Sequence, residues 1–107
     1  MKADREKMTG MSELLDDDQI AEALDTLPAW QRDGSRLIRT VELASFPQAI
    51  QVVNRVAEIA ESNNHHPDID IRWRTLAFRC STHSAGGITT ADVSLAEQID
   101  NALEAVG

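Results

Sequence analysis

The 107-residue sequence is poor in several residue types that build cross-links and sites: it has one cysteine, no tyrosine and only three histidines. The lone Cys80 cannot form an internal disulfide, and its place in an apolar run favours a small buried hydrophobe. We therefore expect a reducing, cytoplasmic setting. No apolar run is long enough to span a bilayer, and the opening residues MKADREKMTGM lack the apolar core of a secretory signal.

Basic residues are also scarce, because ten lysines and arginines accompany eighteen aspartates and glutamates and leave a formal charge of −8. This balance argues against nucleic acid or an anionic membrane as a partner, since both attract basic surfaces, and it remains compatible with a neutral small molecule. The composition, 42% apolar and 26% charged, is that of a globular protein. We expect one domain at residues 16–107, preceded by a disordered tail at residues 1–15.

Hydrophobic periodicity predicts a helix from Asp16 to Leu27, and the Asp33–Gly34 turn signal indicates a β-hairpin after it. A second helix is predicted from about Phe46 to about Asn63, because Ser45 and Gln48 have the capping-box spacing. Pro67 requires this helix to end before the histidines, since proline disfavours helical geometry in the residue before it.

In the segment after Pro67, the apolar residues fall on odd positions as far as Trp73 and on even positions from Leu76 onward. One strand cannot change phase in this way, because its side chains alternate with a period of two. A tight turn or a bulge near Arg74 and Thr75 would explain the change and give a second hairpin, although neither glycine nor asparagine is present there. His83 then belongs to the polar face of the second strand.

A final amphipathic helix is predicted after Thr89, which has the capping-box spacing with Asp92. The order is then helix, two strands, helix, two strands, helix. It indicates an α+β fold of two layers, in which helices cover one face of a four-stranded antiparallel sheet. Open sheet edges without evident protection favour pairing between subunits, and hence a homodimer or homotetramer.

All three histidines, His65, His66 and His83, fall within nineteen residues. They could be unrelated polar residues, zinc ligands, or acid–base groups. Adjacent residues in an extended chain point to opposite faces, which counts against convergence of His65 and His66 on one ion, so we expect no metal. Imidazoles titrate near neutral pH and suit proton transfer, and His65 follows a helix C-terminus, where a cationic ring interacts favourably with the helix dipole.

These residues resemble a motif of the pterin-4a-carbinolamine dehydratases, also called 4a-hydroxytetrahydrobiopterin dehydratases. The resemblance covers the chain from about Ile20 to Leu103, and it rests on several rare residue types at the family's spacing: Glu61, His65, His66, Pro67, Trp73, His83 and Asp92. It implies a lyase that needs no cofactor and removes water from 4a-hydroxytetrahydropterin. The product is quinonoid dihydropterin, which is reused after an aromatic amino-acid hydroxylase reaction.

By this resemblance His65 and His83 are the candidates for acid and base, in an order that stays open, and His66 binds and polarises the pterin. The residues that the resemblance implies for substrate binding are Glu61, Asn64, Pro67, Ser81, Thr82, Ser84, Asp92 and Trp30.

Three of these assignments have an alternative. Glu61 could orient His65 or be a solvated helix residue, and Asp92 could face the site or cap the helix that follows Thr89. Trp30, like Trp73, could line the pocket, or it could be an aromatic residue of the core or of a subunit interface.

A binding role is the alternative to catalysis. Some members of the family are dimerisation partners of a transcription factor, and related domains without the histidines are assembly chaperones. The complete set of histidines in this chain favours the enzyme, because a scaffold does not need them.

Overall fold

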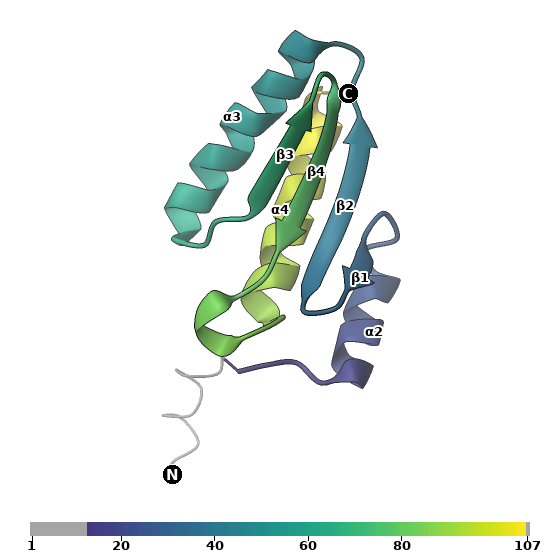
Figure 1. The fold of residues 1–107 in the computed structure, drawn as a ribbon, viewed down its shortest axis with the longest axis vertical. Helices are drawn as coiled ribbons and strands as arrows, with labels where there is room; N and C mark the ends of the chain where they lie inside the picture. The colour runs from purple at the N-terminus through teal and green to yellow at the C-terminus, as the bar shows by residue number, and fades with distance from the viewer. Residues whose placement is uncertain (1–12, 107) are drawn as a thin grey trace.

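A computed structural model of the protein describes residues 13–106, and residues 1–12 of the expected tail lie outside the described part (Figure 1). The predicted order of elements is confirmed. The elements are α2 (Asp17–Asp25), β1 (Gln31–Asp33), β2 (Arg36–Glu42), α3 (Phe46–Asn63), β3 (Asp68–Arg72), β4 (Thr75–Cys80), the short 3-10 helix η2 (His83–Ala85) and α4 (Thr90–Val106).

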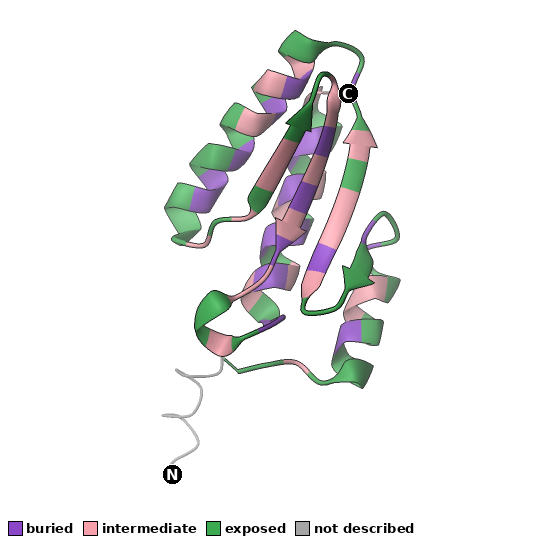
Figure 2. Ribbon diagram, viewed as in Figure 1, coloured by how far each residue is buried: buried purple, intermediate pink, exposed green. Residues whose placement is uncertain are grey.

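The four strands form one antiparallel sheet in the order β1-β2-β4-β3, with α3 and α4 packed together on one face, and this confirms the α+β class. Alternate side chains of β4, Leu76, Phe78 and Cys80, have no exposed surface. They meet the apolar stripes of α3 and α4, which Figure 2 shows as buried bands on the helices. The opposite face of the sheet carries the partly exposed residues between them.

Helix α3 has the ends that the sequence predicted. Ser45 is the N-cap of α3, and its hydroxyl accepts a hydrogen bond from the backbone N–H of Gln48 at 3.2 Å. Asn64 follows the last helical residue with φ 52°, a left-handed conformation that asparagine tolerates better than most residues. No helix within residues 13–106 is long and apolar enough to cross a membrane.

Both hairpins have two-residue turns. In the first, Asp33 pairs with Arg36, so that Gly34 and Ser35 form the turn, and Gly34 has φ +62°. A left-handed residue at the first turn position is characteristic of type II′ hairpin turns, which match the twist of the strands.

The second hairpin explains the phase change of the apolar residues. Arg72 pairs with Thr75, so the turn consists of Trp73 and Arg74, one residue earlier than predicted. Ile71 then lies opposite Leu76, which returns the apolar side chains to the face covered by the helices. Trp73 adopts φ +61°, a backbone conformation that is unfavourable for a bulky residue, and its side chain is largely in solvent, with the residue 76% exposed.

The described chain begins before α2, and residues 13–15 belong to the segment assigned to the tail. The backbone N–H of Leu15 donates to the carbonyl of Ile88 at 2.9 Å, and Leu15 packs against the core. Leu14 lies against Gly87, where an added Cβ would come within 2.9 Å of its side chain. This end of the chain therefore contacts the loop that precedes α4.

The two turns predict stability changes of opposite sign. Gly34→Ala should lower the free energy of unfolding by about 1–2 kcal/mol, because alanine at φ +62° is strained although no atom lies within 4 Å of its Cβ. Trp73→Asn should raise it by up to about 1 kcal/mol, because asparagine tolerates the left-handed conformation better. Urea denaturation measures both. A loss of stability in Trp73→Asn would show that the indole ring contributes more than its backbone conformation costs.

Candidate active site

The first histidine is positioned by the end of α3. Asn64 turns the chain through its left-handed conformation, and the backbone N–H of His65 donates to the carbonyl of Ala60 at 3.1 Å. The His65 ring then reaches toward the start of α4. Its side chain is 17% exposed, so the ring is largely enclosed but still in contact with solvent.

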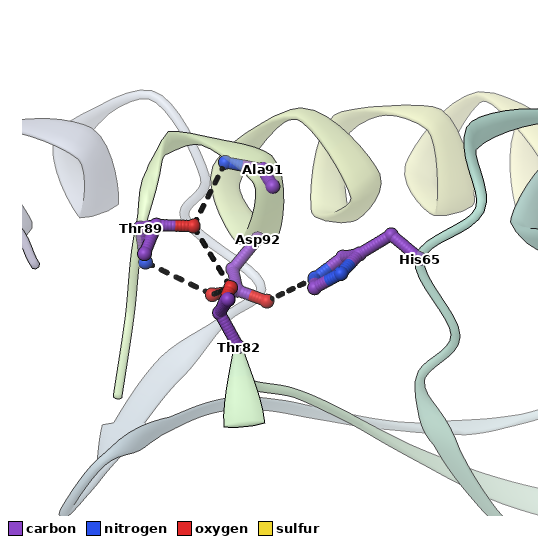
Figure 3. A network of polar contacts seen from close by, with 5 residues as sticks. All are labelled: His65, Thr82, Thr89, Ala91 and Asp92. Carbon is purple, nitrogen blue, oxygen red and sulfur yellow. Dashed lines mark hydrogen bonds and ion pairs between the residues drawn. The ribbon is translucent and has the colours of Figure 1, made fainter. Parts of the chain in front are cut away.

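The His65 ring meets the buried carboxylate of Asp92. Its Nε2 atom lies 2.6 Å from Oδ1 of Asp92, whose side chain has no exposed surface (Figure 3). A buried carboxylate is costly unless its oxygens are paired, and His65 is one such partner.

The second carboxylate oxygen of Asp92 binds two threonines. Oδ2 accepts the backbone N–H of Thr89 at 2.9 Å and the hydroxyl of Thr82 at 2.8 Å. The hydroxyl of Thr89 in turn accepts the N–H of Ala91 at 3.2 Å, which caps α4. The capping interpretation of Asp92 is therefore confirmed, and its other carboxylate oxygen holds His65.

His66 has a different partner. Its Nε2 atom lies 2.9 Å from Oε2 of Glu61, and the two side chains are 54% and 79% exposed. The suggestion that Glu61 orients His65 is thus corrected, because Glu61 contacts the neighbouring histidine instead. Since this pair is open to solvent, its contribution to stability is small.

His83 is not on β4 as predicted, because that strand ends at Cys80. It begins η2, in a loop closed by an isolated bridge in which Thr82 N–H donates to the carbonyl of Gly87 at 2.8 Å. Gly86 permits the tight return with φ +80°. The ring of His83 is exposed, and no hydrogen bond within residues 13–106 joins it to His65 or His66.

The other residues implied by the resemblance differ in their surroundings. Asn64 is the exposed C-cap of α3, and Pro67 is half-buried in the connection to β3. Ser81 is half-buried between β4 and η2, whereas Ser84 is exposed within η2. These four residues share the two connections that carry the histidines.

Trp30 lies elsewhere, in the core. It is 3% exposed, and its indole N–H donates at 2.8 Å to Oδ1 of Asp100, which also binds Arg39. Asp100 follows Asp92 by two turns of α4, about 12 Å along the helix axis. Trp73 lies at the other end of β4 from η2. The structure therefore does not bring either tryptophan of the described chain to the histidines.

A cavity of about 360 Å³ opens beside His65, which is within the size range of small-molecule sites. Its wall consists of the end of α3 and the first two turns of α4, with the lining residues Asn63, His65, Thr90, Ala91 and Ser94. The lining residues of α4 were not among the site residues predicted from the sequence. The spacing of Thr90 and Ser94, one turn apart at the start of an amphipathic helix, is the signal that could have found them.

No group of three histidine, cysteine, aspartate or glutamate side chains within the described residues is close enough to hold a metal ion.

Comparisons with known proteins identify the family of this chain. The family model described as pterin 4 alpha carbinolamine dehydratase matches residues 13–102. A protein of Nocardia farcinica with that provisional name is 62% identical over 89 residues, which are 83% of this chain and 94% of the relative. A relative of the same provisional name from Mycobacteroides abscessus is 59% identical over 87 residues, which are 81% of this chain and 93% of the relative.

Solved structures share the fold. The transcriptional coactivator/pterin dehydratase from Brucella melitensis superimposes with a TM-score of 0.80 at 26% identity, over 82% of this chain and 96% of the other. A pterin dehydratase-like protein described as a RuBisCO assembly factor in the alpha-carboxysome has a TM-score of 0.60 at 18% identity, over 69% of this chain and 88% of the other. At this identity the likeness shows the fold alone. Because the family model matches residues 13–102 and the two relatives are 62% and 59% identical, the chain belongs to the pterin-4a-carbinolamine dehydratase family.

Cys80 lies near Asp92 but is not a nucleophile. Burial raises the pKa of its thiol far above the ordinary value of 9.0, and the negative charges of Asp92 and Asp68 raise the pKa further. The native thiol is therefore protonated and inaccessible.

Two measurements follow from this raised pKa. Iodoacetamide should alkylate Cys80 much more slowly in the native protein than in urea at the same pH. The free energy of unfolding should fall as the pH rises above about 9, because only the unfolded thiol ionises there. Equal alkylation rates in the native and the unfolded protein would contradict the burial of Cys80.

Proposed function

We propose that the protein dehydrates a 4a-hydroxytetrahydropterin to quinonoid dihydropterin and water by histidine acid–base catalysis. The observation that carries this proposal is the pairing of His65 with the buried Asp92 beside a cavity, in a chain of the dehydratase family. A carboxylate behind an imidazole fixes the ring and leaves its other nitrogen for a ligand.

The reaction requires two proton transfers. The C4a hydroxyl takes a proton and leaves as water with the electrons of the C–O bond, while a ring nitrogen of the pterin loses a proton and forms a C=N bond. An acid and a base satisfy this balance without a metal or a redox cofactor. We assign these roles to His65 and His83, and the polarisation of the bound pterin to His66.

The position of the histidines on two connections supports this division. His65 is held from behind by Asp92, whereas His83 stands exposed at the start of η2, where its ring is free to approach a ligand. Asn64, Pro67, Ser81 and Ser84 flank them on the same connections and are the candidates for contacts with the pterin. The physiological context that we propose is pterin recycling after an aromatic amino-acid hydroxylase, in the cytoplasm.

His65→Ala and His83→Ala should each lower the dehydration rate by about 10²- to 10⁴-fold, the usual effect of removing a positioned acid or base, or about 3–5.5 kcal/mol of barrier. The measurement is stopped-flow dehydration of a carbinolamine made in situ, with the spontaneous rate subtracted.

Gln51→Ala, on the exposed surface of α3, is the matched control and should keep the wild-type rate. Far-UV circular dichroism should show that all three variants are folded. Wild-type turnover in both histidine variants would refute the catalytic assignment.

A binding role is the second candidate. It is supported by the exposed Trp73 beside the open edge strand β3, where Ile71 is 43% exposed, since such apolar groups favour association with a second copy or another protein. We propose that the protein is a homodimer or homotetramer. Sedimentation measures this state, and a role in binding alone would survive His65→Ala and His83→Ala unchanged.

A further inference from the structure

The hydroxyl protons around Asp92 can be counted. A carboxylate oxygen accepts hydrogen bonds, so Oδ2 of Asp92 accepts the N–H of Thr89 and also the single hydroxyl proton of Thr82, at 2.8 Å. The oxygens of Thr82 and Thr89 are also 2.8 Å apart, and that bond therefore takes its proton from Thr89. The Thr89 hydroxyl accepts the N–H of Ala91. In this series of hydrogen bonds, each donor is therefore directed toward Asp92.

The same carboxylate determines the protonation of the His65 ring. Both oxygens of an ionised carboxylate only accept hydrogen bonds, and the donors on Oδ2 are the partners that this buried charge needs, so Oδ1 accepts the proton of Nε2 of His65 at 2.6 Å. Nε2 then carries a proton in both the neutral and the charged ring, and Nδ1 is the nitrogen that exchanges its proton.

We propose that Thr82 and Thr89 are positioning residues, whose directed hydrogen bonds to Asp92 keep Nε2 of His65 protonated and leave Nδ1 to act on the substrate. The catalytic part of this inference rests on the proposed function. It changes the role of Thr82, which the family resemblance implied to be a substrate contact, because its hydroxyl is committed to Asp92 and Thr89. Thr89 has no exposed surface and cannot touch a ligand in the cavity.

Thr82 also links the two candidate catalytic histidines. Its backbone pairs with Gly87 and closes the loop that carries His83, while its side chain binds the carboxylate that holds His65. A change in the Thr82 side chain therefore acts on His65, whereas the backbone bridge that supports His83 remains.

The first test is Thr82→Val, which has nearly the same shape and removes only the hydroxyl. We expect kcat to fall about 10- to 100-fold with little change in KM, the effect of a misplaced catalytic group. Thr82→Ser should restore most of the rate, and Thr40→Val, on an exposed position of β2, should have no effect. Thr82→Ala replaces the valine variant if the latter does not fold.

A double-mutant cycle separates positioning from substrate contact. In a His65→Ala background, Thr82→Val should change the remaining rate by less than about twofold, because a residue that acts through His65 has no effect without it. An undiminished loss in that background, or a raised KM with unchanged kcat in the single variant, would mean that Thr82 touches the substrate and would overturn the proposal.

A spectroscopic test needs no turnover. In the substrate-free protein, ¹⁵N NMR should show the His65 Nε2 proton protected from exchange in the wild type and in Thr82→Ser, and exchanging faster in Thr82→Val. A wild-type ring protonated on Nδ1 alone would overturn the positioning role and leave the proposed function intact. An inactive wild type with the protected Nε2 proton would refute the function and keep the hydrogen-bond arrangement.

Discussion

The buried carboxylate of Asp92 determines how three distant segments of the chain meet. A charge without exposed surface is unfavourable unless donors surround it, and here the donors come from the end of α3, the end of β4 and the cap of α4. Loss of any one donor would leave the others with an incompletely paired charge. The carboxylate therefore links the correct packing of the helices on the sheet to the placement of the His65 ring, and in this way it joins the stability of the fold to the candidate site.

The features of the fold that were predicted correctly follow from rules of local geometry. The capping spacing at Ser45 and the proline at position 67 bound α3 from both sides, and the structure has both ends as predicted. The phase change before Leu76 required a turn, because a strand has a fixed period of two, and a turn is present. Each of these inferences depends on residues within a few positions of one another, so one sequence contains all the information that they need.

The side-chain partners could not be predicted in this way. Glu61 precedes His65 by four residues and His66 by five, so spacing along the helix favoured His65, yet after the left-handed turn at Asn64 it is His66 that contacts Glu61. Trp30 finds its partner 70 residues away on α4, where no local pattern points. The left-handed Trp73 contradicts the preferences of its residue type, which explains why the turn was placed one residue late. Tertiary packing decides such cases.

Two of the carboxylates of α4, Asp92 and Asp100, attach the helix to other elements. Asp92 is held by the loops at one end of the sheet, and Asp100 is held two turns later by Trp30 and by Arg39 of β2. A rod attached at two points along its length can neither slide nor roll about its axis. The two attachments therefore fix the position of α4, and with it the position of the carboxylate that binds His65.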